Sequence, residues 1–132
     1  MKKNNLMAIH INSFYRPDYL QRCLKSIQIA NKNLRYDVYI SHDGYLNPYS
    51  KKPILKSYGN VSSWKECIDV ITDFTMAVSF RTIVSIDNYN RGLQRAILEP
   101  VLDLYKEYDT VLTMTDDYCL YPSALIFAAK TS

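Results

Sequence analysis

The feature that most constrains the fold is a regular alternation of short apolar runs with longer segments of helical periodicity. Four runs of strand length each end in polar residues: 6–12, 36–41, 82–86 and 110–114. Between them, apolar residues recur at the spacing of a helix. A strand–helix–strand order repeated in this way predicts parallel strands joined by crossover helices. We therefore expect an α/β fold, a three-layer sandwich with helices on both faces of a mostly parallel sheet.

Two helix starts can be read from the local sequence. Pro17 suits a first helical position, where no backbone N–H is needed, and this helix should fade between residues 30 and 33. A polar stretch, 45–62, is expected to be a loop. After it, Ser63 and Glu66 match a capping box, so the second helix should begin with Ser63 as its N-cap.

Two further helical signals lie in the last third of the chain. A helix is expected after residues 90–92. Pro100 should kink this helix or divide it at Glu99, because proline cannot donate the hydrogen bond that a helix interior needs. Residues 120–129 predict the beginning of another helix.

Length and composition favour one ordinary globular domain. The chain has 132 residues, of which 48% are hydrophobic and 22% charged, so a single domain over 1–132 is expected. The net charge is +3, and the lysine pairs at 2–3 and 51–52 are too scattered to form a nucleic-acid-binding surface. We therefore expect no nucleic-acid partner.

The three cysteines, Cys23, Cys67 and Cys119, lie far apart and form no CxxC motif, which predicts neither a zinc site nor a disulfide framework. Cys23 and Cys67 fall within apolar periodic stretches and should be buried thiols. The first residues lack the features of a signal peptide, and no apolar stretch approaches transmembrane length. These features predict a cytoplasmic protein with no transmembrane segment.

Polar residues follow every predicted strand, at the edge of an open parallel sheet where ligands bind. The pairs are Asn12–Ser13, Asp43–Gly44, Asp87–Asn88 and Asp116–Asp117. Carboxylates brought together from separate strands repel one another unless a cation neutralises them. Magnesium or manganese suits such a site, since each takes one or two carboxylates together with water and phosphate oxygens. The alternative is that these acids order loops or cap helices.

Two arginines and a histidine lie near the same edge. Arg16 and Arg91 could each reach a diphosphate, because guanidinium matches phosphate geometry. Arg91 is the better candidate, because backbone N–H groups at a helix N-terminus also favour anions. The alternative for both is an exposed arginine at a helix start. His42 could hydrogen-bond a ligand at this edge or be a surface histidine in a turn, and the second is favoured. His10, inside a strand, is expected to be structural.

Four segments resemble, in the same order, a known enzyme family. Residues 13–27, SFYRPDYLQRCLKSI, resemble the opening of family-two and related GT-A glycosyltransferases. Residues 36–44 resemble the next strand of that family, which ends in Asp-Asp-Gly, and 90–92 are similar to its Asn-x-Gly element. Residues 108–122 resemble the strand with the metal-binding DXD motif, in a form closer to the Glu-Asp-Asp of the N-acetylglucosaminyltransferase I group.

The resemblance implies roles for individual residues. Asp43 would contact the nucleotide base or ribose, and Asp116 the sugar or ribose. Asp117 would coordinate Mn²⁺ or Mg²⁺ that bridges the diphosphate. Arg16 would lie near the nucleotide, as the loop after the first strand does in the family. The complete predicted nucleotide-binding set is Asn12, Ser13, Arg16, Asp43, Arg91 and Asp116, with Asp117 as the metal ligand.

The implied function is metal-dependent transfer of a sugar from a nucleotide-diphosphate donor to the hydroxyl of a saccharide or other acceptor. GT-A enzymes carry the acceptor site and catalytic base after the metal motif, and 15 residues follow Asp117 here. The chain is thus expected to be the donor half, and it identifies no catalytic base. A non-catalytic nucleotide-binding or interaction module of the same fold stays open. A metal-dependent phosphotransferase is disfavoured, because it would place acids where Asn12–Ser13 lie.

Overall fold

The computed structural model describes residues 7–54 and 61–119 and shows an α/β sandwich around a four-stranded sheet. The chain forms, in order, β1 (Met7–Ser13), α1 (Pro17–Ala30), β2 (Asp37–His42), α2 (Val61–Ala77), β3 (Thr82–Ile86), α3 (Leu93–Leu104) and β4 (Thr110–Thr115). All strand pairs are parallel. The predicted fold class is confirmed.

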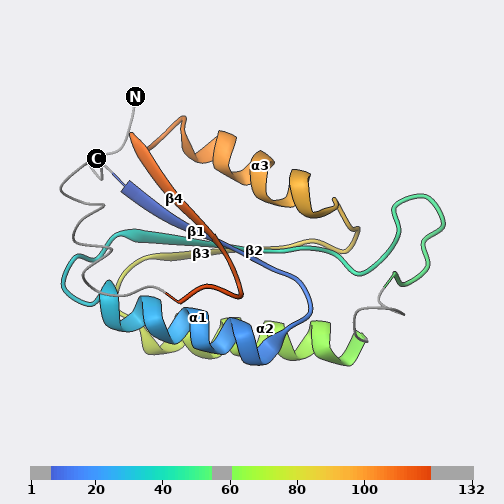
Figure 1. Cartoon of the computed structure of the whole chain (residues 1–132), viewed down its shortest axis with the longest axis horizontal. Helices are drawn as coiled ribbons and strands as arrows, with labels where there is room; N and C mark the ends of the chain where they lie inside the picture. The colour runs from blue at the N-terminus through green and yellow to red at the C-terminus, as the bar shows by residue number, and fades with distance from the viewer. Residues whose placement is uncertain (1–6, 55–60, 120–132) are drawn as a thin grey trace.

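The strand order is β3-β2-β1-β4, so the chain runs outward from β1 to β3 and then crosses back to the other side of β1. Crossovers of one hand change faces when the chain changes direction across the sheet. Accordingly, α1 and α2 cover one face and α3 covers the other (Figure 1). The reversal lies between β1 and β4, which makes their carboxyl ends the topological switch point, where open α/β sheets bind ligands.

The face of the sheet under α1 and α2 carries the main hydrophobic core. Ile9, Ile11, Val38 and Ile40 from the sheet are fully or almost fully buried. They pack with apolar side chains that recur at helical spacing on the two helices, among them Leu20, Leu24, Ile27, Cys67, Ile71 and Phe74. The prediction that Cys23 and Cys67 are buried is confirmed.

The face under α3 is polar. His10 is fully buried between Thr113 and Ser41, with its Nδ1 2.9 Å from the Thr113 hydroxyl and its Nε2 2.9 Å from the Ser41 hydroxyl. It is a structural histidine, as expected. The apolar cluster on this side is small, with Ala8, Leu104 and Tyr108 at its centre.

One helix prediction is wrong, and one alternative of another is excluded. In the described residues, α2 already includes Val61, so Ser63 lies within the helix and is not its N-cap. Serine in a helix costs only about 0.5 kcal/mol relative to alanine, so it does not oblige a helix to begin. Pro100 lies inside α3, which continues to Leu104, so the proline does not divide the helix at Glu99. Ala96 and Leu104 are both buried and hold the helix against the sheet on either side of the proline. The helix expected at 120–129 lies outside the described residues.

Candidate functional site

A cleft of about 560 Å³ lies at the switch point, between the carboxyl ends of β1 and β4 and the end of β2. We call it the switch-point cleft. The side chains of most interest that line it are Asn12, Tyr15, Arg16, Asp43, Asp116 and Asp117. Carboxylates from the ends of β2 and β4 are thus brought to one cleft, as the strand-end pattern predicts, whereas Asp87 after β3 lines a separate small cavity and is paired with Arg91.

Asp43 lies at the end of β2 and is almost completely buried. Its Oδ1 accepts hydrogen bonds from the backbone N–H groups of Gly44 and Arg91, both at 2.9 Å. Its Oδ2 accepts one from the Asn90 amide at 3.1 Å. Burial raises the pKa of Asp43, and the backbone hydrogen bonds partly oppose that rise. This carboxylate therefore joins the end of β2 to the loop that leads into α3.

The Asn-x-Gly element is the other half of this connection. The Asn90 amide also donates to the carbonyl of Gly44 at 2.9 Å, and its Oδ1 accepts from the N–H of Gly92 at 2.9 Å. Gly92 has φ of 83°, which favours glycine. A Cβ on Gly44 would lie 2.4 Å from backbone atoms of Asn88 and Tyr89. Sequence reasoning noted these residues for their resemblance and missed that they hold Asp43.

His42 corrects a prediction, because it is fully buried rather than on the surface. Its Nε2 lies 3.0 Å from the Trp64 carbonyl, which can only accept, so Nε2 donates and Nδ1 accepts from the Ser13 hydroxyl at 3.0 Å. The ring also stacks on the Trp64 indole, with 5.0 Å between ring centroids. Burial lowers the pKa of His42 to about 4, so the ring is neutral near neutral pH. The ring is covered by Trp64 of α2. Because Trp64 lies 22 residues away in the chain, its contact with His42 could not be predicted from the local sequence.

The same arrangement decides the position of Ser13. Its side chain is buried and its hydroxyl donates to His42, so it supports the end of β1 from inside the core. Trp64 donates from its indole N–H to the Asp43 carbonyl at 2.6 Å, which fixes the end of β2 from the same side. Ser13 is therefore not among the residues that line the switch-point cleft.

Arg16 and Asp116 form an ion pair across the switch point. The Arg16 Nη2 lies 2.5 Å from the Asp116 Oδ1, and the side chains are 35% and 5% exposed respectively. Burial raises the pKa of Asp116, and the Arg16 hydrogen bond and charge oppose that rise. Neighbouring Asp117 is exposed, and its Oδ1 accepts from the Thr115 hydroxyl at 2.5 Å. That hydrogen bond is the main cause of a lowered pKa for Asp117.

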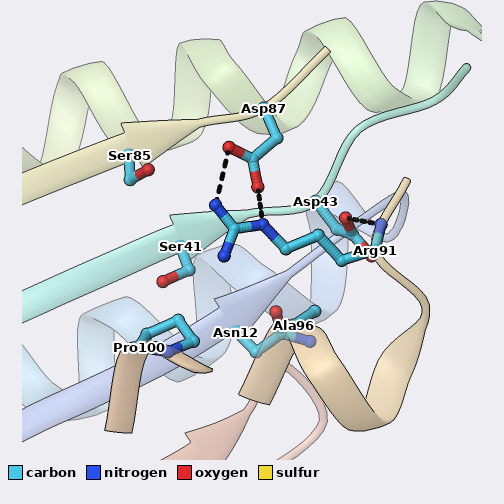
Figure 2. A pocket seen from close by; sticks show the side chains of 8 residues that line it. All are labelled: Asn12, Ser41, Asp43, Ser85, Asp87, Arg91, Ala96 and Pro100. Atoms are coloured by element: carbon cyan, nitrogen blue, oxygen red, sulfur yellow. Dashed lines mark hydrogen bonds and ion pairs between the residues drawn. The ribbon is translucent and has the colours of Figure 1, made fainter. Parts of the chain in front are cut away.

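Arg91 lies on the other side of Asp43, next to a small enclosed cavity of about 20 Å³ (Figure 2). Its Nε lies 2.8 Å from the Asp87 Oδ2, and its Nη1 lies 3.7 Å from Glu99. Its side chain is therefore paired with carboxylates and does not line the switch-point cleft. Arg91 lies just before the N-terminus of α3, as expected. Its backbone N–H already donates to the Asp43 Oδ1.

Asn12 lines both the small cavity and the switch-point cleft. The residue is only 5% exposed, and its Oδ1 finds no hydrogen-bond partner among the described residues. A buried amide oxygen without a partner is unfavourable by about 1–3 kcal/mol. The Asn12 Oδ1 is therefore an acceptor available to a donor or a cation at the switch point.

The acidic residues fit a metal ion only together with a ligand. Within the described ranges, no three His, Cys, Asp or Glu side chains are grouped so that they could hold a metal. Asp117 offers a free carboxylate oxygen, while Asp116 is occupied by Arg16. Magnesium and manganese are commonly held by one or two carboxylates and the phosphates of a substrate. The donor set therefore suits an ion that arrives with phosphate oxygens.

Comparisons of the chain with protein-family models, with curated proteins and with solved structures gave no match. The class of protein is therefore defined by its own fold and site. It is a parallel α/β protein with strand order β3-β2-β1-β4 and an acidic, aromatic-lined cleft at the switch point. In the part of the chain that the structure describes, no helix combines the length and apolar character needed to span a bilayer.

Proposed function

We propose that the switch-point cleft binds a nucleoside diphosphate sugar together with Mn²⁺ or Mg²⁺, as the donor site of a glycosyltransferase. One observation carries the proposal: Asp43, Asp116 and Asp117, from the ends of two different strands, line one cleft beside an arginine. This is the combination of charges that a metal diphosphate requires. The acceptor is a hydroxyl group of a saccharide or related molecule, and the cytoplasm is the proposed location.

The nucleoside end of the donor would lie between Asp43 and the residues after β1. Asp43 keeps unused acceptor capacity on Oδ2, which takes a single hydrogen bond from Asn90 at 3.1 Å. Phe14 and Tyr15 line the same cleft and form an edge-to-face pair with ring centroids 5.4 Å apart. Aromatic rings beside a hydrogen-bond acceptor suit a flat base that carries N–H donors.

The diphosphate end would lie near β4. Asp117 is the exposed carboxylate there, and Arg16 can form paired hydrogen bonds with phosphate oxygens. When bound, the metal ion would offset the charge that develops on the departing diphosphate. The residues of this chain would hold the ion, orient the diphosphate and fix the loop that carries Asn90.

A second candidate is a nucleotide-binding or interaction module without catalytic activity. It is favoured by the degree to which the carboxylates already have partners, since Asp43 accepts three hydrogen bonds and Asp116 is paired with Arg16. The two candidates differ in metal dependence. A donor site needs the ion for tight binding of the diphosphate, whereas a simple binding module does not.

Calorimetry of UDP and GDP binding, with and without Mn²⁺, tests the proposal. We expect metal-dependent binding that Asp117→Asn weakens by at least about tenfold, equivalent to about 1.4 kcal/mol. Asp103→Asn is the control, because Asp103 is an exposed acid paired with Lys106 away from the cleft. Binding that is independent of metal would favour the second candidate. No binding of either nucleotide would refute the donor site and any nucleotide-binding module, and would leave only an interaction module.

A further inference from the structure

The Arg16–Asp116 pair has an unequal geometry. Asp116 is almost entirely buried, whereas about a third of the Arg16 side chain is exposed. A buried, ionised carboxylate without a partner is strongly unfavourable, so Asp116 needs a positive charge beside it whenever it is ionised. Nothing requires that charge to belong to an arginine, because a divalent cation satisfies the same carboxylate.

Arg16 also has contacts that do not depend on Asp116. Its guanidinium carbon lies 5.1 Å from the centre of the Tyr19 ring and 5.8 Å from that of the Tyr15 ring. A guanidinium group is attracted to aromatic faces at such distances. Arg16 can therefore turn from Asp116 toward an anion in the cleft while it keeps these ring contacts.

The cleft gives independent evidence of an incoming ligand. Asn12 lines it with a side chain that is 95% buried and an Oδ1 that lacks a partner among the described residues. Asp117, two residues after the end of β4, adds a second carboxylate beside Asp116. The ion pair thus lies beside oxygens suited to a cation, and Arg16 is the positively charged residue among those that line the cleft.

We propose that Arg16 is a displaceable internal counter-ion: it neutralises Asp116 until a divalent cation and a diphosphate enter together, so that each ligand alone binds weakly. The inference rests on the proposed function of the same cleft and adds its mode of regulation. The cation takes Asp116 from Arg16, and the freed guanidinium binds the diphosphate. By linkage, each ligand raises the affinity of the other by the same factor.

Titrations with Mn²⁺ alone, inorganic pyrophosphate alone and both together test this on the whole chain. All variants should be titrated at the same pH, so that differences in protonation do not enter the comparison. We expect Arg16→Gln to bind Mn²⁺ alone about tenfold more tightly than the wild type, and pyrophosphate alone more weakly. The coupling factor between the two ligands should fall by about the same tenfold.

Two further variants separate the counter-ion role from general effects. Arg22→Gln removes the same charge from a guanidinium 5.1 Å from the Tyr19 ring, and it should leave the affinity for Mn²⁺ nearly unchanged. Arg16→Lys keeps the charge and should keep the weak binding of Mn²⁺, which tests the idea even where Arg16→Gln folds poorly. An Arg16→Lys variant that binds Mn²⁺ alone tightly would overturn the counter-ion role.

The outcomes also distinguish this inference from the proposed function. Wild-type protein that binds Mn²⁺ and pyrophosphate together, with an Arg16→Gln variant whose affinity for Mn²⁺ alone does not rise, overturns the counter-ion role and leaves the donor site intact. Wild-type protein that binds neither ligand, even when both are present, overturns the donor site and this inference with it.

Discussion

The two faces of the sheet are built from opposite kinds of residue. Under α1 and α2, the alternate positions of β1 and β2 are aliphatic and fully or almost fully buried, such as Ile9, Ile11 and Ile40. Under α3, the intervening positions of the same strands include His10 and Ser41, which bond to each other. The same strands thus serve an apolar core on one side and a hydrogen-bonded polar layer on the other.

The difference between the two faces indicates that stability depends mainly on the α1–α2 side and function on the α3 side. Central parallel strands usually read as continuous apolar runs, because both of their faces are buried. Here β1 reads MAIHINS, and two of its three polar residues, His10 and Asn12, face the α3 side, whereas Ser13 bonds to His42 on the other side. The α1–α2 side can hold the sheet together, which leaves the α3 side free to carry polar groups toward the switch-point cleft.

The largest expected effect concerns the apolar face. Ile11→Ala should lower the free energy of unfolding by about 2–5 kcal/mol, because it leaves a cavity in the packed core. Ile29→Ala is the matched control on α1, where the side chain is 62% exposed, and it should cost less than about 1 kcal/mol. Urea unfolding of both variants measures the contrast. Equal losses would mean that the apolar face does not dominate stability.

A second prediction concerns the buried histidine of each face. Burial lowers the pKa values of His10 and His42 to about 4, below the ordinary value of 6.5. Above about pH 6.5 both rings are neutral in the folded and the unfolded chain, and the free energy of unfolding is at its full value. As the pH falls from 6.5 toward 4, the unfolded chain binds protons that the buried rings do not, and the free energy of unfolding falls. The slope is about 1.4 kcal/mol per pH unit for each histidine, so about 2 kcal/mol each is lost by pH 5.

Urea unfolding at a series of pH values between 7 and 4 measures this loss. His10→Gln keeps hydrogen-bonding groups between Thr113 and Ser41 and should remove about half of the pH dependence. Asp43 and Asp116 have raised pKa values, so their contribution has the opposite sign and favours the folded state as the pH falls. An unchanged slope in His10→Gln would show that the polar face does not hold its histidine neutral.

The parts of the fold and the site that the sequence predicts are those that depend on residues close together in the chain or on the geometry of a parallel sheet. The alternation of strand and helix patterns is local, and it predicted all four strands to within one residue at each end. The convergence of Asp43 and Asp117 on one cleft also followed, because parallel strands place their carboxyl ends at one edge. Local pattern and sheet geometry were enough for both.

Contacts between distant side chains could not be predicted in the same way. The burial of His42 depends on Trp64 of α2, and the pairing of Arg16 depends on Asp116, which lies 100 residues later in the chain. Sequence periodicity states which face a residue occupies and not which side chain it meets. The switch-point cleft was therefore predictable as a location, but the existing partners of its charged groups were not.

The smallest predicted effect lies in the polar layer itself. Asp37 can only accept, so Tyr108 donates to its Oδ2 at 2.5 Å, and Tyr39 must then donate to the Tyr108 oxygen at 3.1 Å. Tyr39→Phe removes the outermost bond of this chain and should cost about 0.5–1.5 kcal/mol.

Tyr45→Phe is the control, since the Tyr45 ring packs on Trp64 at 4.5 Å and its hydroxyl has no hydrogen bond to the described residues. If both variants unfold at the same urea concentration as the wild type, the hydroxyl chain contributes nothing measurable. In that case the stability of the polar face would depend on other groups, such as His10 with Thr113 and Ser41.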